Sequence, residues 1–170
     1  VHAWALDRDK GFYGAFFPLA MAKQSMTQFK SQDDHAFGYT PDTAYFTLDG
    51  MFRQRLKKIA TELTLNHLIH YNYHPKWKIP MAPEAYRRDL SLFGDQYSNF
   101  NAGKILLYLE GLAGLYYSIP DKQLTLQPAL PKAWDWMELR LPIAGQWTQI
   151  SYRHDGVQTS GSPFPVVVLE

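Results

Sequence analysis

The sequence predicts a mainly α-helical chain that ends in a small antiparallel β-sheet module. Helical periodicity marks most of the first two thirds of the chain. Near residue 118 the pattern changes, and apolar and polar residues then alternate with a period of two. We therefore expect helical hairpins over residues 1–118 and a β-module over residues 119–170.

The composition is that of a globular chain with ample material for a core. Of the 170 residues, 46% are hydrophobic and 15% are aromatic. Seventeen basic and sixteen acidic residues leave a formal charge of +1, and no basic cluster exceeds two neighbours. A nucleic-acid partner is therefore not expected, and the absence of a run of about 18 apolar residues argues against a membrane partner. Because the chain has no Cys, it offers no disulfide, no thiolate nucleophile and no Cys-ligated metal site.

The strongest predicted helix begins at Thr40-Pro41-Asp42. A hydroxyl at the N-cap, a proline in the first turn and an acid near the positive end of the helix dipole all favour a helix start. Apolar residues then recur at spacings of four and three, at Leu48, Phe52, Leu56, Ile59 and Leu63. The pattern predicts one helix that continues to about His70 and ends before Pro75.

Two further helices and one long connection complete the predicted helical part. Phe16–Phe29 is a candidate helix, and Asn101–Tyr117 is apolar on most faces, which predicts a helix buried inside a helical assembly. Residues 74–94 contain three aromatic residues and three prolines, which indicate a long irregular connection. Loops of this kind commonly line a substrate cleft.

The last third predicts three strands and two weaker ones. Alternation is clear around Leu124–Leu126, Trp136–Leu141 and Trp147–Tyr152. A turn at His154-Asp155-Gly156 precedes a weaker strand. Prolines confine a last strand, Phe164–Leu169, to a sheet edge.

The segments Phe93–Leu115 and Leu124–Ile143 carry a family resemblance. They contain a D-Q-Y loop, an N-A-G helix opening, and then a strand followed by P-A-L-P-x-x-W and L-R-L-P. This order resembles the carboxyl-terminal end of the six-hairpin glycosidases, the (α/α)6-barrel enzymes that include glucoamylases, trehalases, rhamnosidases, and maltose and kojibiose phosphorylases. The order of elements extends over Thr40–Ile143, while the sharp motifs lie within Gly94–Leu141.

The resemblance implies that the chain is the carboxyl-terminal piece of a larger enzyme. A barrel of six helical hairpins needs far more chain than the predicted helical part, which has room for about three or four helices. The resemblance also implies a carbohydrate substrate, no cofactor, and an extracellular, periplasmic or lysosomal location. The rest of the enzyme would then be present in the same protein or as a separate chain.

Asp95 is the candidate general base for cleavage of a glycosidic bond. Inverting enzymes use one carboxylic acid on the leaving oxygen and one carboxylate on water, roughly 6.5–9.5 Å apart. Trehalase-like members carry an acid-x-Tyr loop before their last inner helix, which Asp95-Gln96-Tyr97 matches, although Asp stands where they have Glu. Tyr97, Asn99 and Asn101 are then expected to bind substrate or orient the base. Alternatively, Asp95 caps a turn, Asn101 is an N-cap and Tyr97 packs in the core.

No general acid is evident in this chain. Asp33, Asp34 and Asp42 are the candidates, but Asp42 is explained by the helix start and the other two by a solvated loop. Glu110 lies in a very apolar helix, where a carboxylate must pair or face a cavity, and a structural partner such as Lys104 or Arg88 is favoured. The acid is therefore expected outside this chain, which alone should be catalytically silent.

Histidines and aromatic residues form two further groups. His67, His70 and His74 fall at i, i+3 and i+7, a spacing that would suit a Zn or Cu site. Histidines at a helix end more often interact with solvent or with the helix dipole, and no metal is expected. Aromatic faces stack on the CH faces of sugars, and we select Tyr39 and Trp77 as substrate-binding candidates. They belong to a set that is otherwise expected to fill the core: Phe12, Tyr13, Phe16, Phe17, Phe37, Tyr39, Tyr45 and Trp77.

Three hypotheses stay open at the level of sequence. The leading one is the carboxyl-terminal part of a glycosidase-like enzyme with Asp95 as base. The second is a non-catalytic carbohydrate-binding or structural module, which predicts that Trp136 and Trp147 are exposed on one sheet face. The third is an interaction module whose exposed apolar helix face, within Asn101–Leu115, docks onto the remaining part of the enzyme.

Overall fold

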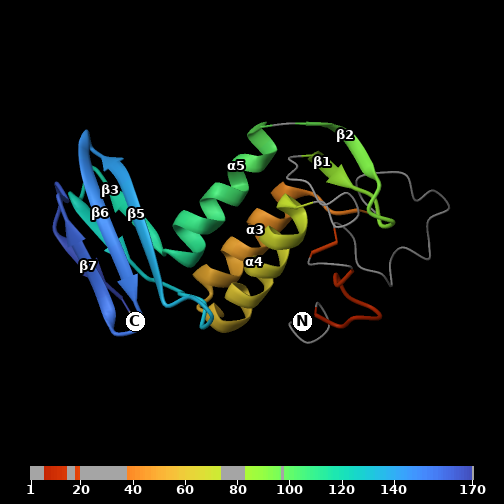
Figure 1. Cartoon of the computed structure of the whole chain (residues 1–170), viewed down its shortest axis with the longest axis horizontal. Coiled ribbons are helices and arrows are strands. Elements are labelled where there is room, and N and C mark those ends of the chain that lie inside the picture. The colour runs from red at the N-terminus through yellow and green to blue at the C-terminus, as the bar shows by residue number, and fades with distance from the viewer. Residues whose placement is uncertain (1–5, 15–17, 20–37, 74–82, 97, 170) are drawn as a thin grey trace. The chain divides into compact units, whose positions relative to one another are not determined.

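A computed structural model describes residues 6–14, 18–19, 38–73, 83–96 and 98–169 of the chain (Figure 1). The chain divides into two compact units, Val1–Leu106 and Leu107–Glu170. In the described residues, strands occupy about as much of the chain as α-helices do, so the expectation of a mainly α-helical chain is only partly met. The division into domains after residue 118 stays a prediction. The predicted helix Phe16–Phe29 falls almost entirely outside the described residues.

The first unit is built on three α-helices, α3 (Pro41–Arg53), α4 (Lys57–Asn72) and α5 (Ser98–Leu106). The predicted start of α3 is confirmed, with Thr40 at the N-cap and Pro41 and Asp42 in the first turn. The Thr40 hydroxyl hydrogen-bonds the Thr43 hydroxyl at 2.6 Å instead of capping the backbone. Helix α3 packs against both α4 and α5.

The prediction of a single helix from Thr40 to about His70 was wrong, because residues 54–56 are not helical and separate α3 from α4. Arg55 has a φ of 60°, a left-handed conformation that ends α3 and lets the chain turn into α4. Leu56 is 38% exposed, so it belongs to neither core-facing stripe. The helical spacing of apolar residues continues across residues 54–56 by coincidence. Such spacing in the sequence cannot show that the helix axis changes direction there.

A β-hairpin follows, formed by β1 (Pro83–Tyr86) and β2 (Leu92–Gln96), where an irregular connection was expected. The Arg87 guanidinium stabilises the turn by donating to the Leu92 carbonyl at 2.6 Å and by lying 4.9 Å from the centre of the Phe93 ring. The two strands are only four and five residues long, and they contain a proline and a glycine. The alternation of apolar and polar residues is therefore too short to predict a strand.

The predicted helix Asn101–Tyr117 is shorter than expected. Helix α5 ends at Leu106 and continues as a π-helical turn, η2 (Leu107–Leu112). Gly114 then adopts a φ of 58°, and the chain enters the strand β3 (Leu115–Ser118). Leucine and tyrosine fit a strand as well as a helix, so the apolar run alone could not mark this boundary.

The second unit is a β-module of two three-stranded sheets. One has the order β3-β4-β8, with β4 (Gln123–Leu126) antiparallel to β3 and parallel to the edge strand β8 (Val166–Val168). The other is an antiparallel meander of β5 (Trp136–Ile143), β6 (Gln146–Arg153) and β7 (Gly156–Ser160). The predicted strands after Lys122, including the edge strand, are confirmed.

The two sheets of the β-module share one hydrophobic core. Leu115, Leu124 and Leu126 come from the first sheet and are at most 5% exposed. The second sheet contributes the inward side chains of β5 and β6: Met137, Ile143, Ile150 and Tyr152. Burial raises the pKa of the Tyr152 phenol, which keeps that group neutral in the core. The core fixes which side of β5–β6–β7 faces outward.

Candidate functional site

Asp95 lies in β2 and not in a loop, one residue from the end of that strand. The register of β1 and β2 shifts between Pro83 and Ala85, so an irregularity of the pairing lies opposite the Gly94–Asp95 segment. Bulges of this kind are frequent beside active sites, where they redirect a side chain. Helix α5 begins at Ser98, three positions after Asp95. The role of Asp95 as a general base stays a prediction.

Glu84 is a second carboxylate in this hairpin, and the sequence interpretation missed it. Gly94 has a φ of 70°, and a Cβ at Gly94 would collide with the Glu84 carboxylate. The Glu84 side chain therefore crosses the hairpin directly over the residue that precedes Asp95. Glu84 and Gly94 are ten positions apart in sequence, so only the pairing of β1 with β2 shows that they are neighbours.

The other predicted substrate-binding residues are described unevenly. Asn99 and Asn101 lie in the first turns of α5, whereas Tyr97 and Trp77 lie outside the described residues. Tyr39 is 2% exposed, its backbone pairs with Tyr86 at 2.8 and 3.0 Å, and its hydroxyl lies where a side chain on Gly14 would be. The roles of these residues in substrate binding stay predictions.

The candidate acids and metal ligands are described only in part. Asp42 lies in the first turn of α3, and Glu110 is half-buried in η2, where its backbone carbonyl accepts the Tyr116 hydroxyl at 3.1 Å. Asp33 and Asp34 lie outside the described residues. His67 is fully buried in α4, and His70 lies in the same helix. Within the described part of the chain, no group of three or more His, Cys, Asp or Glu side chains could hold a metal ion.

Lys104 is a buried titratable residue that the sequence interpretation treated only as a partner for Glu110. It lies in α5, three residues after Asn101, and is 4% exposed. Gly103 allows α5 to approach Tyr45 of α3 closely, which draws this part of α5 into the interior. Burial disfavours the charged ammonium and lowers the pKa of Lys104 to about 7.

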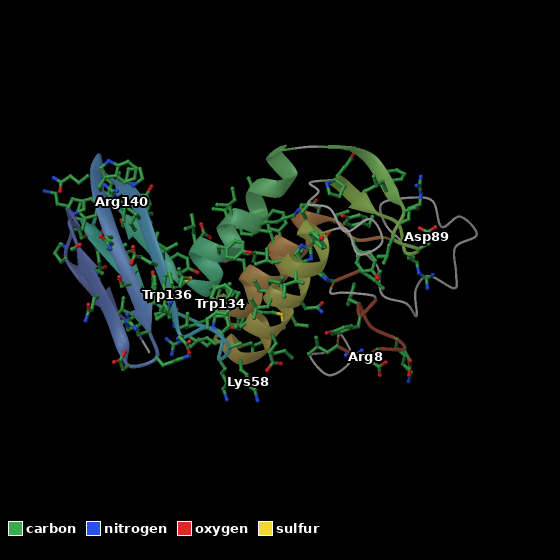
Figure 2. The ribbon with its side chains drawn as sticks, viewed as in Figure 1. Arg8, Lys58, Asp89, Trp134, Trp136 and Arg140 are labelled. Carbon is green, nitrogen blue, oxygen red and sulfur yellow. The ribbon has the colours of Figure 1, made fainter. Side chains whose placement is uncertain are left out.

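The outward side of β5–β6–β7 carries two exposed tryptophans, and we call it the outer face. Trp136 and Trp147 are each 61% exposed, as the carbohydrate-binding hypothesis predicted. The strand register places polar residues between them on the same face: Glu138, Arg140, Gln149, Ser151, Arg153, Gln158 and Ser160. Figure 2 labels Trp136, the first residue of β5, and Arg140, which lies near the middle of the same strand.

A pocket of about 230 Å³ lies at the hairpin end of β6 and β7. Its lining is mostly polar and comprises Ser151, Arg153, Asp155, Gly156, Val157 and Gln158. Arg153 pairs directly with Trp136 across β5 and β6, so one residue of the pocket lining is the cross-strand neighbour of an exposed tryptophan. This combination of an aromatic surface and hydrogen-bonding groups is suited to a small amphipathic ligand.

Comparison with known proteins adds one finding that bears on these sites. Residues 118–168, which span the β-module from the end of β3 to β8, match the protein-family model described as glycosyl hydrolase family 65, C-terminal domain. No curated protein matches the chain. No helix among the described residues is long and apolar enough to cross a membrane. The match confirms the resemblance to the carboxyl-terminal part of such an enzyme: over residues 118–168 the β-module is similar to the C-terminal domain of glycosyl hydrolase family 65.

Proposed function

We propose that the chain is the carboxyl-terminal portion of an enzyme that cleaves glycosidic bonds. The observation that carries this proposal is the family match over residues 118–168. Two features of the first unit support it: α3, α4 and α5 are packed helices of the kind that a helical barrel requires, and the Asp95 hairpin leads into α5. In the proposal these helices belong to the end of an (α/α)6 barrel whose other helices lie outside this chain.

Asp95 acts in this proposal as the general base of an inverting hydrolysis. Its carboxylate removes a proton from a water molecule, whose oxygen attacks the anomeric carbon from the face opposite the leaving group. A carboxylic acid outside this chain donates a proton to the departing glycosidic oxygen, and the configuration at the anomeric carbon inverts. Where phosphate takes the place of water, the same displacement would be a phosphorolysis.

The substitution Asp95→Asn in the longest protein that contains this chain tests the role of Asp95. An amide cannot accept the proton from water, so kcat should fall by about 10²- to 10⁴-fold with little change in KM. Asp89→Asn is the matched control, because Asp89 lies in the turn of the same hairpin and its carboxylate accepts hydrogen bonds from Ser91 at 2.6 and 2.9 Å. Glycoside cleavage is followed by proton NMR, which also reports the anomer released.

The control variant and the anomer decide the interpretation. Asp89→Asn should keep kcat within about twofold of the wild-type value, since surface changes rarely disturb a site. Retention of configuration would contradict an inverting base, and so would an Asp95→Asn enzyme with wild-type kcat. The companion variant Glu84→Gln should reduce kcat less than Asp95→Asn, because Glu84 would act only by packing over Gly94.

A second candidate function is a non-catalytic carbohydrate-binding or structural module. The exposure of Trp136 and Trp147 on one sheet face favours it, because large indole side chains are usually well buried. This function requires neither Asp95 nor a general acid. Sugar binding that survives Asp95→Asn, in a protein that never cleaves glycosides, would favour it over the catalytic proposal.

A further inference from the structure

Trp136 presents its indole ring to solvent next to a polar pocket. It is 61% exposed, although burial of a tryptophan would remove a large apolar surface from water. The register pairs Trp136 with Arg153, and side chains directly opposite on one face have Cβ atoms about 4.5–5.5 Å apart. Arg153, which lines the pocket, is therefore the direct cross-strand neighbour of Trp136 on the outer face.

Four polar groups converge at this pocket. Ser151, Arg153 and Gln158 lie on the outer face, where Ser151 pairs with Gln158 across β6 and β7, and Asp155 lies in the connecting turn. On the other edge of β6, Glu138 of β5 pairs with Ser151, so its carboxylate also lies on the outer face. Together these side chains offer hydroxyl, guanidinium, amide and carboxylate groups within one small area.

This arrangement matches the two-sided chemistry of a sugar ring. A pyranose has an apolar face of CH groups, which can stack on an indole, and a rim of hydroxyl groups that donate and accept hydrogen bonds. The pocket volume of about 230 Å³ is below the roughly 300–1,000 Å³ of sites that enclose drug-sized ligands, which suits one sugar unit. Two carboxylates, Glu138 and Asp155, offset the positive charge of Arg153, so the site does not favour a polyanion.

We propose that Trp136 and the pocket of Ser151, Arg153, Asp155 and Gln158 form a carbohydrate-binding subsite on the β-module, distinct from the Asp95 hairpin. We call it the Trp136 subsite. It rests on the carbohydrate-binding function proposed above for this module and does not depend on catalysis. Its role is to hold one sugar unit of a longer glycan at a surface that carries no part of the proposed reaction.

Trp147 provides an internal comparison, because it has the same exposure on the same face. It lies six positions before Arg153 in β6, which is about 20 Å along a strand. The Arg140 guanidinium lies 5.2 Å from the centre of the Trp147 ring and occupies one of its faces. Trp136 should therefore bind sugar where Trp147 does not.

NMR titration of the isotopically labelled full chain tests the subsite. The probes are maltotriose, cellotriose and mannotriose, each added to about 10 mM, because a single-ring contact is expected to have a Kd of about 1 mM. The five tryptophans give separate indole N–H signals, which Trp136→Phe and Trp147→Phe assign. With at least one probe, the Trp136 indole and the backbone amides of Ser151, Arg153 and Gln158 should shift and saturate.

Variants then separate binding from folding. Trp136→Ala should weaken binding by about tenfold or more, Trp136→Phe should keep most of it, and Trp147→Ala should change it by less than about twofold. Gln158→Ala should also weaken binding while leaving the unfolding midpoint unchanged. The proposal is overturned if no probe gives a saturable shift, if the shifts map to Trp147, or if Trp136→Ala binds like the wild type.

The outcome is separable from the catalytic proposal. Loss of sugar binding in Trp136→Ala with full glycoside cleavage would support the subsite and leave Asp95 untouched. Cleavage that depends on Asp95, in a protein whose β-module binds none of the probes, would overturn the subsite alone. NMR shifts confined to residues around Asp95 would also overturn the Trp136 subsite and leave the catalytic proposal standing.

Discussion

At the scale of single residues, Lys104 links burial to the pH dependence of stability. Its pKa is lowered to about 7 in the folded chain by burial and returns to about 10.5 on unfolding. Between these values the unfolded state binds more protons, so the Lys104 contribution to the free energy of unfolding increases as pH rises from about 7 to about 10.5. Below pH 7 both states are charged, and the cost of the buried ammonium is present in full.

Replacing Lys104 by Met should remove this dependence. Lys104→Met is expected to stabilise the first unit at pH 7 by about 2 kcal/mol or more, and to flatten stability between pH 7 and 10. Urea unfolding measured at several pH values gives the comparison, with the exposed Lys58→Met of α4 as control. A Lys104→Met variant less stable than the wild type at pH 7, or with an unchanged pH slope, would contradict this account.

The exposure or burial of some single residues could be predicted from the sequence, and that of others could not. The exposure of Trp136 and Trp147 could be predicted because alternation fixes which residues share a face of β5 and β6. Lys104 could not be identified as buried, since its burial depends on the close approach that Gly103 permits between α5 and α3. The position of Glu84 beside Gly94 could not be predicted, because only the pairing of β1 with β2 brings the two residues together.

At the scale of elements, Gly114 makes the change from η2 to β3 possible. Its φ is 58°, and a Cβ there would collide with the backbone carbonyl of Gln127, whose N–H donates to the Gly114 carbonyl at 2.8 Å. Gly114→Ala should therefore destabilise the β-module by about 2–4 kcal/mol, from left-handed strain and the clash together. Thermal unfolding followed by circular dichroism measures the loss.

Gly145 supplies the matched control for this prediction. It also has a positive φ, 81°, but a Cβ at Gly145 would meet no atom within 4 Å. Gly145→Ala should cost only about 1–2 kcal/mol, the strain alone. Equal losses in the two variants would show that the contact with Gln127 adds nothing to the requirement for glycine at position 114.

Element boundaries were the least predictable feature of the fold. The strands after Lys122 followed from alternation, and the start of α3 followed from Thr40-Pro41-Asp42. The break at Arg55 did not, because no glycine or proline marks it and the apolar spacing continues across it. The transition from α5 through η2 to β3 was missed for a related reason, since the same leucines and tyrosines suit both structures.

At the scale of the whole molecule, the two compact units should unfold as separate cooperative steps. Leu48 lies at the centre of the first unit and Leu126 in the core of the β-module, and both are fully buried. Leu126→Ala should lower the free energy of unfolding of the β-module, and Leu48→Ala that of the helical unit, each by about 2–5 kcal/mol. The midpoint of the corresponding transition should fall with it. Calorimetry distinguishes the steps, and a single transition shifted by both variants would contradict the division.

The barrel itself cannot be derived from this chain. Each helix of the first unit exposes a large apolar side chain: Phe46 on α3 at 72%, Ile69 on α4 at 63% and Ile105 on α5 at 62%. In the proposed barrel these side chains would contact neighbouring helices. The β-module, by contrast, closes its own core and could be recognised from sequence alone.

Native mass spectrometry combined with a glycoside-cleavage assay on the same fractions tests the central claim most directly. The account predicts that the chain purified alone, at 19.6 kDa, cleaves no glycoside, and that every active fraction contains additional chain carrying the general acid. Cleavage by the lone 19.6 kDa chain would contradict it, because the acid would then lie within these 170 residues.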